Sequence, residues 1–300
     1  MASIESLKKR IHTTEDLQSV VKSMRVLAAL NLRQYEQTVL SQDLYVQTIE
    51  RGLQILLKMK PGGDALATQA PGGRLGAIVF GSDQGLCGSF NEQIALYALN
   101  NMNAFKNQPN ERGILAIGHR VARQLEDAGQ PIGECLPTPS SRAGITVMAQ
   151  DILVKIETWQ REQDFDRIIL YYQALLPEKG VAPRMRILLP IDREWLQRLE
   201  EIPWPTRSLP IFTMNWDQLF SQLIHHYLFI SLSKAFAESL ASENLSRLLA
   251  MQGAERNIAE HREELLGDFH EQRQSSITEE LLDIIGGFEA LKSSPEYRES

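Results

Sequence analysis

The stretch that decides the fold is residues 4 to 56, IESLKKRIHTTEDLQSVVKSMRVLAALNLRQYEQTVLSQDLYVQTIERGLQIL, which carries an apolar seam along its whole length. Alternate steps of three and four residues reach sixteen positions, of which twelve are apolar: Ile4, Leu7, Ile11, Thr14, Gln18, Val21, Arg25, Ala28, Leu32, Tyr35, Val39, Gln42, Val46, Ile49, Leu53 and Leu56. No proline precedes Pro61. The pattern therefore predicts one helix of about 55 residues, roughly 80 Å long, that needs a partner helix to cover its seam.

The other end of the chain repeats the pattern. Asn215 can cap a second helix, and no proline follows it before Pro295. The second seam passes through Phe220, Leu223, Tyr227, Ile230, Lys234, Ala237, Ala241, Asn244, Leu248, Met251, Glu255, Ile258, Arg262, Leu265 and Phe269. Because both helices attach to the same middle segment, we expect an antiparallel helical hairpin, with two separate helices of one bundle as the alternative.

The second seam then shifts by one residue to Ile277, Leu281, Ile284, Phe288 and Leu291. About 55 residues of pairing bring the second helix level with Ile4 at about residue 270. Beyond that point we expect a single amphipathic helix. An exposed apolar stripe of this kind is typical of a binding surface.

Between the two helices, short apolar strands alternate with helices. Strands are predicted at 75–80, 113–117, 167–172 and 185–189, and helices at 91–102, 121–128 and 143–160. The alternation predicts a Rossmann-like α/β domain with a mostly parallel, helix-covered sheet. The predicted division is a coiled-coil helix over 1–60, a Pro- and Gly-bracketed linker over 61–73, the α/β domain over 74–210 and a second coiled-coil helix over 211–294.

Composition limits the possible functions. The chain is 43% hydrophobic and 23% charged, with a net charge of −7. This acidity argues against a nucleic-acid binder and against independent adhesion to anionic lipid. No stretch has the length of apolar sequence expected for a membrane span, and no targeting segment is recognisable. Two cysteines, Cys87 and Cys135, form no disulfide framework and fit a reducing cytoplasm.

The loop at 81–88 follows a strand and precedes a helix, which is where α/β sheets bind phosphates. It lacks both the G-x-G-x-x-G spacing and a Gly-rich loop ending in Lys and Ser or Thr, so a tight structural turn is favoured over a nucleotide site. No histidine lies near Cys87 in the sequence, and His225 and His226 are adjacent and face different ways on a helix. We expect no cofactor, no metal and no catalytic constellation.

Several strings resemble the gamma subunit of F-type ATP synthases. Residues 242–251, SENLSRLLAM, with Ala254 and Asn257, are similar to the family string SE-x-x-x-R-x-x-A-M-x-x-A-x-x-N. Residues 273–281, RQSSITEEL, resemble its RQ-x-x-IT-x-E-L ending, and 82–88, SDQGLCG, with Asn91, its SD-x-GLCG-x-x-N turn. Near the N-terminus, 22–24 (KSM) followed by two alanines resembles its K-A-M and alanine-rich stretch.

The resemblance implies a noncatalytic rotor. In the family, the helical hairpin runs through a ring of three alpha and three beta subunits, and the α/β domain sits with the epsilon subunit on the membrane c-ring. Rotation driven by ion flow changes the beta sites in turn. The implied location is the cytoplasmic face of a bacterial inner membrane, with membrane contact only through the complex. The sequence leaves open whether protons or sodium ions drive rotation, and whether the complex is a housekeeping or an alternative ATPase.

The resemblance also assigns residues. Those expected to meet the alpha-beta ring are Met24, Arg33, Arg247, Arg273, Gln274, Thr278, Glu279, Leu281 and Ile284, and those of the globular-domain turn are Asp83, Gly85, Leu86, Cys87 and Gly88. Arg33 is the one charge left at 31–34 (NLRQ), where the family has a basic run of roughly K-x-R-R that could meet acidic beta loops. Gln84 stands where the family usually has Arg.

Two other functions stay open at this point. One is a cytosolic α/β enzyme with helical dimerisation arms, which nucleotide binding by the isolated chain would favour. The other is a coiled-coil tether, which failure to join an alpha-beta ring would favour.

Overall fold

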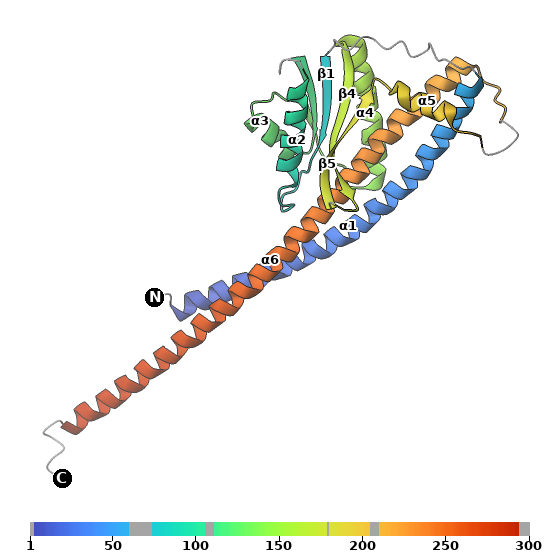
Figure 1. Ribbon diagram of the computed structural model, residues 1–300. Coiled ribbons are helices and arrows are strands. Elements are labelled where there is room, and N and C mark those ends of the chain that lie inside the picture. The colour runs from blue at the N-terminus through green and yellow to red at the C-terminus, as the bar shows by residue number, and fades with distance from the viewer. Residues whose placement is uncertain (1–2, 60–73, 106–110, 179, 205–209, 294–300) are drawn as a thin grey trace. The chain divides into compact units, whose positions relative to one another are not determined.

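The computed structural model describes residues 3–59, 74–105, 111–178, 180–204 and 210–293, so the predicted linker at 61–73 lies outside the described residues. The chain divides into two compact units, which are described separately: Leu27–Leu249, here called the sheet unit, and Met1–Val26 with Ala250–Ser300, here called the shaft unit. Helix α1 (Ile4–Met59) and helix α6 (Trp216–Ser293) contribute to both units. Each is one uninterrupted helix, as predicted (Figure 1).

Among the described residues of the sheet unit, five strands form one sheet in the order β3-β2-β1-β4-β5. The strands are β1 (Arg74–Phe80), β2 (Arg112–Ile117), β3 (Glu134–Leu136), β4 (Phe165–Leu176) and β5 (Gly180–Leu189). All neighbouring pairs are parallel except β4 and β5, which are antiparallel. The predicted mostly parallel sheet is confirmed. Strand β3 was not predicted, because three residues are too few to show a period of two.

Helices cover both faces of this sheet. Helices α2 (Phe90–Ala104) and α3 (His119–Asp127) pack on the face that includes Ala77 and Val79. Helix α4 (Arg142–Glu162) and part of α6 pack on the opposite face, against Ile78 and Phe80 (Figure 1). Alternate residues of β1 therefore point to different layers, as a buried parallel strand requires. One helix of the long pair is itself a layer of the α/β domain.

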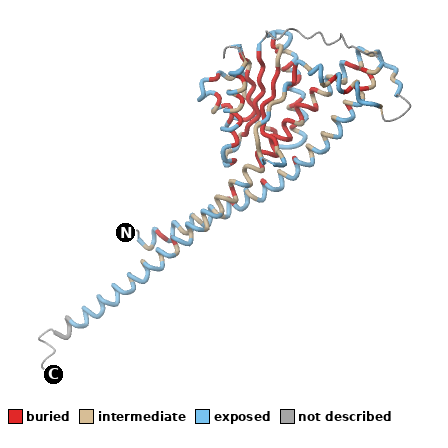
Figure 2. The backbone as a smooth tube through the Cα atoms, viewed as in Figure 1, coloured by how far each residue is buried: buried red, intermediate tan, exposed pale blue. Residues whose placement is uncertain are grey.

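The middle of α6 is the most deeply buried helical segment of the sheet unit. From Leu228 to Asn244 every residue is buried except Phe229 and Lys234, which are half-buried (Figure 2). Phe236 packs edge-on against Phe80 with ring centroids 4.8 Å apart, while Lys234 pairs with Asp43 of α1. The predicted seam explains only the face toward α1. The other faces are buried because the sheet lies against them.

A smaller core joins the end of α1 to the start of α6. Helix α5 (Arg193–Glu201), which was not predicted, contributes Leu196 and Leu199 to a cluster with side chains of both long helices: Ile49, Leu53, Leu56, Leu57, Phe220 and Ile230. The Nε1 of Trp216 donates to the carbonyl of Leu56 at 2.9 Å. Asn215 accepts a hydrogen bond from Asp217 N at 3.3 Å, which confirms the predicted cap.

In the shaft unit, the two helices also run antiparallel. Arg25 Nε lies 3.1 Å from Glu255 Oε2, and Arg262 Nη1 donates to Gln18 Oε1 at 3.4 Å, so positions that rise along α1 meet positions that fall along α6. Over both units, all sixteen predicted seam positions of α1 and all fifteen of α6 up to Phe269 are buried or half-buried. The predicted seams are confirmed.

The end of α6 differs over the residues whose side chains are described, 273–289. From 273 to 289 every residue is exposed except Ser276, which is half-buried (Figure 2). The exposed fractions include 55% for Leu281 and 69% for Ile284. The predicted single helix beyond residue 270 is confirmed for these residues, while the side chain of Leu291 lies outside the described part of the chain.

Candidate functional site

The turn after β1 lies at the carboxyl edge of the sheet, close against the start of α3. A Cβ on Gly81 would lie 2.4 Å from Val121 Cβ, and one on Gly118 would lie 2.7 Å from the backbone nitrogen of Ser82. Gly118 also has a φ of 102°, which residues with a side chain rarely adopt. Both glycines are therefore required by the close approach of the turn to α3.

Asp83 holds this turn to two neighbouring segments. Its Oδ1 accepts a hydrogen bond from His119 N at 2.9 Å, and its Oδ2 accepts from Thr138 N at 2.6 Å and Thr138 Oγ1 at 2.8 Å. Burial alone would raise the pKa of Asp83, but these hydrogen bonds outweigh it and lower the pKa. His119 is the first residue of α3, so a carboxylate of the chain itself occupies the helix end where an α/β sheet could hold a phosphate.

A buried polar cluster links the same turn to the start of α2. Asn91 Oδ1 accepts from Ser82 N at 2.9 Å, and Asn91 Nδ2 donates to Ser82 Oγ at 2.8 Å. Cys87 is 3% exposed, with its Sγ 3.6 Å from Ser82 Oγ and 3.5 Å from Asn91 Nδ2. The thiol is packed within a structural cluster, which is the ordinary setting of a buried cysteine.

Arg247 of α6 reaches the turn from a distant part of the chain. Its Nη2 lies 2.6 Å from Glu243 Oε1, one helical turn earlier, and donates to the carbonyls of Gln84 at 3.4 Å and Gly85 at 3.5 Å. From the sequence, Arg247 and Gly85 were predicted as members of two separate sites. The structure brings them together, so α6 and the turn form one joint.

Glu243 is the buried charge of this joint. It is 6% exposed, and burial, which outweighs the nearby Arg247, raises its pKa. Its Oε2 has no hydrogen-bond partner among the described residues. Tyr35 of α1 is also buried, and burial together with the charge of Glu243 raises the pKa of Tyr35. Three elements, α1, α6 and the turn, therefore meet at one partly compensated charge.

Leu86 is the part of the turn that faces solvent. Its side chain is 59% exposed, and its φ of 62° lies in the left-handed region, which costs a residue with a side chain roughly 1 to 2 kcal/mol. The following Gly88 has a φ of 59°. The turn thus presents an apolar side chain to solvent from a strained backbone conformation. Strained conformations of this kind cluster at functional sites.

The described residues offer little for catalysis. Cys135 Sγ lies 3.4 Å from His119 Nδ1, but burial raises the pKa of the Cys135 thiol, which keeps it protonated. No three His, Cys, Asp or Glu side chains in the described ranges gather where they could hold a metal ion. Within the same ranges, no helix has both the length and the apolar character needed to cross a membrane.

The shaft unit carries the remaining predicted residues except Arg33. Met24 is 36% exposed, beside the inward Arg25. Arg273, Gln274, Thr278, Glu279, Leu281 and Ile284 all lie on the exposed end of α6. The hydroxyl of Thr278 donates to the carbonyl of Gln274 at 2.9 Å and so stays within its own helix. Arg33, in the sheet unit, is exposed.

Three residues of these sites were missed by sequence reasoning. Glu243 lies within the string that resembles the family, and its spacing of four from Arg247 was a usable signal. Glu255 was recognised as a seam position, but its pairing with Arg25 follows only from the register. Thr138 gave no signal, because it meets Asp83 only when β1 and β3 are placed in one sheet.

A family model described as ATP synthase matches residues 3–291. Relatives include the ATP synthase gamma chain of Cyanothece sp., 25% identical, and that of Geobacter metallireducens, 27% identical; each alignment covers 97% of this chain and 100% of the relative. The fold is similar to that of a chain in the mitochondrial ATP synthase of Euglena gracilis, with a TM-score of 0.65 at 16% identity over 99% of this chain and 98% of that one. It is also similar to a chain of the central stalk and c-ring of the Tetrahymena thermophila enzyme, with a TM-score of 0.55 at 20% identity over 78% and 99%. The chain belongs to the gamma-chain family of ATP synthase.

Proposed function

We propose that this chain is the central rotating shaft of an F-type ATP synthase, a noncatalytic subunit that couples ion flow to ATP synthesis or hydrolysis at beta subunits. Family membership supports the assignment, and the observation that carries the mechanism is the long helix pair that continues as one exposed apolar helix. Neither alternative, an enzyme with dimerisation arms or a tether, is supported by the comparisons.

The proposed partners follow from this role. Three alpha and three beta subunits surround the shaft unit, and the epsilon subunit and the c-ring contact the sheet unit. The chain itself is then attached to a bacterial inner membrane only through the complex, on the cytoplasmic face. Met24, Arg273, Gln274, Thr278 and Glu279 of the shaft unit are the proposed contacts with the ring, with Arg33 of the sheet unit as a weaker electrostatic one. Arg247 is also proposed as a contact, but its side chain is 11% exposed and is held at the joint by Glu243 and the carbonyls of Gln84 and Gly85. The turn 83–88 presents Leu86 as a further candidate contact.

The exposed stripe on α6 fits a bearing surface. Ile277, Leu281, Ile284 and Phe288 are each 48% to 69% exposed and recur at helical spacing. An apolar opening of the ring would bury these four side chains. We expect that Leu281→Asp with Ile284→Asp weakens assembly with alpha and beta subunits by a few kcal/mol, since each buried side chain contributes about 1.5 to 3 kcal/mol.

The matched control is Leu40→Asp with Leu44→Asp, a pair on α1 that is 66% exposed at both positions. Reconstitution titrations would compare the two variants, and light scattering would show whether the tip variant of the isolated chain aggregates less than the parent. Equal assembly and equal aggregation of parent and tip variant would reject the tip as the bearing surface.

Met24 tests the coupling role. Met24→Lys places a cation on the exposed side of α1, where ion pairs with acidic ring loops would resist rotation. We expect normal folding and a lower ratio of ion pumping to ATP hydrolysis in membranes. An unchanged ratio would remove Met24 from the proposed contacts.

Separately, calorimetry of the isolated chain should detect no tight ATP binding, and stoichiometric micromolar binding would contradict a noncatalytic subunit.

A further inference from the structure

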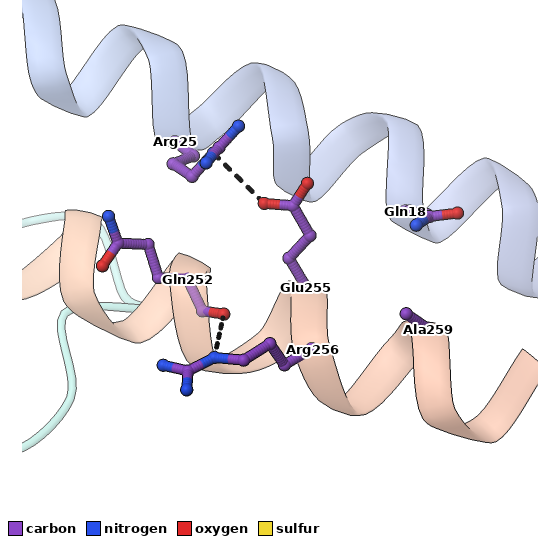
Figure 3. Close-up of a pocket in the computed structure, with 6 residues that line it drawn as sticks. All are labelled: Gln18, Arg25, Gln252, Glu255, Arg256 and Ala259. Atoms are coloured by element: carbon purple, nitrogen blue, oxygen red, sulfur yellow. Dashed lines mark hydrogen bonds and ion pairs between the residues drawn. The ribbon is translucent and has the colours of Figure 1, made fainter.

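The helix pair of the shaft unit is interrupted by a polar gap. Apolar seam residues of this unit, such as Leu7, Val21, Met251 and Leu265, are buried at 2% to 6% exposure. The polar seam residues Gln18 and Arg25 of α1, on either side of Val21, face Arg262 and Glu255 of α6. A surface groove of about 400 Å³ lies at this place, lined by Gln18, Arg25, Gln252, Glu255, Arg256 and Ala259 (Figure 3).

At this level polar side chains replace apolar knobs at Gln18 and Arg25, two of three consecutive seam positions of α1, with the buried Val21 between them. Knobs-into-holes packing normally fixes the rotation of each helix about its own axis, so polar contacts share that role here. In the gap, Arg25 and Glu255 point toward each other from the two helices, whereas Arg256 turns back to the carbonyl of Gln252 at 3.5 Å (Figure 3). The ion pair, like the hydrogen bond from Arg262 to Gln18, therefore links the two helices directly at this level.

The pair is close enough to hold an orientation. Arg25 Nε lies 3.1 Å from Glu255 Oε2, and the two side chains are 35% and 26% exposed. Arg25 Nε itself is buried and has no hydrogen-bond partner among the described residues, so the carboxylate of Glu255 is what compensates its charge. Removing the carboxylate would leave the buried cationic nitrogen of Arg25 without compensation. Rotation of α1 about its own axis would lower this cost by exposing the nitrogen to water.

Rotation of α1 at this level would move the side chain of Met24. It adjoins Arg25, and neighbouring residues on a helix keep a fixed angle of about 100° between them. We infer that the Arg25–Glu255 ion pair is a positioning device that sets the rotation of α1 in the polar gap, and so the direction in which Met24 faces. The consequence for coupling rests on the proposed function, but the orientation itself is a property of this chain alone.

The ion pair also favours the observed register of the two helices over its neighbours. If α1 slipped by one heptad in one direction, Arg25 would stand opposite Arg262, and in the other direction Gln18 would stand opposite Glu255 while Ile11 faced Arg262. Both slips leave charges unpaired in the seam. The observed arrangement is the one that pairs both Arg25 and Arg262 with an acceptor.

The test measures orientation in the full isolated chain. Spin labels at Met24→Cys and at Glu260→Cys, an exposed position of α6, report their distance distribution by pulsed electron paramagnetic resonance, with Cys87→Ala and Cys135→Ala as background. We expect Glu255→Gln to broaden the distribution about twofold, as loss of a local constraint does. Arg25→Glu, which opposes two carboxylates, should broaden it as well.

The exchanged pair, Arg25→Glu with Glu255→Arg, should restore the parent width, whereas Glu263→Gln, an exposed control on the same helix, should leave it unchanged. An unchanged distribution in Glu255→Gln, or no recovery in the exchanged pair, would overturn the inference.

The same variants in the assembled complex separate this inference from the proposed function. We expect the ratio of ion pumping to ATP hydrolysis to fall by about twofold to fivefold in Glu255→Gln and to recover in the exchanged pair. A broadened distribution with an unchanged ratio would support the positioning by Arg25 and Glu255 while rejecting the proposed contact of Met24 with the ring.

Discussion

The same helix, α6, lives in two different environments. In the sheet unit its middle is buried on several sides, with Leu232 and Phe236 at 0% and 1% exposure. Among the described residues of the shaft unit, its covered positions lie along the seam with α1, and from 273 to 289 every residue except Ser276 is exposed. A continuous helix can therefore be anchored at one level by a folded core and remain available at another for a partner. Stability and proposed function are thus separated along one element.

The largest expected effect tests that separation with one residue type. Phe236→Ala removes a ring that packs against Phe80 and should lower the free energy of unfolding by about 3 to 5 kcal/mol. Phe288→Ala, at a position 68% exposed on the same helix, should change it by less than about 0.5 kcal/mol. Urea unfolding followed by circular dichroism compares the two. A similar loss of unfolding free energy in both variants would mean that the end of α6 packs against a partner in solution.

The next effect concerns the joint between α6 and the turn. Arg247→Met keeps the volume but leaves the buried Glu243 without its cation, and should destabilise the chain by about 3 kcal/mol. Arg256→Met, on the exposed side of α6, serves as the control and should stay within about 0.5 kcal/mol. If both variants unfold at the same denaturant concentration, the joint does not anchor α6.

A smaller loss is expected on the other side of the turn. Asp83→Asn removes the charge that accepts hydrogen bonds from His119 and Thr138, and should lower stability at neutral pH by about 1 to 2 kcal/mol. The lowered pKa of Asp83 means that its contribution is present above the ordinary value of 3.8 and is lost as pH falls through the folded value. The parent and variant should therefore converge in acid. A gap that stays constant down to about pH 2 would show that the charge is not responsible.

The smallest effect is a change in pH dependence. The pKa of Glu243 is raised above its ordinary 4.5, so the folded state binds its proton more tightly than the unfolded state does. The associated stability is complete below 4.5 and is lost as pH rises through the folded value. Relative to Glu243→Gln, the parent should become less stable as pH rises over this window. The reverse trend in unfolding curves would mean that Arg247 outweighs burial.

Sequence reasoning was strong where a single period governs a long element. The alternate spacing of three and four residues from Ile4 to Leu56 predicted which side chains of α1 are covered, because a helix that touches one partner buries one stripe. The same spacing, compared with the length of α1, predicted where α6 becomes a single helix. In the sheet unit the alternation of strands and helices predicted the parallel core.

Other features have no local signal. The burial of α6 on its remaining faces depends on the sheet that packs against Phe236, and α5 is recognisable as a support only once Leu196 meets the ends of the long helices. The antiparallel β5 was predicted as a strand, but its direction is set by the short connection from β4.

The sequence alone predicts the long helix pair, the α/β class of the middle segment and, through matching strings, the family. The register of the two helices and the joint come from the tertiary structure: Arg25 with Glu255, Asp83 with Thr138, and Glu243 with Arg247 on the carbonyls of Gln84 and Gly85. The physical reason is that periodic burial acts between residues three and four apart, where the sequence displays it directly. Buried charges are compensated by whichever groups the fold brings within hydrogen-bond distance, and those groups come from segments 55 and 163 residues away.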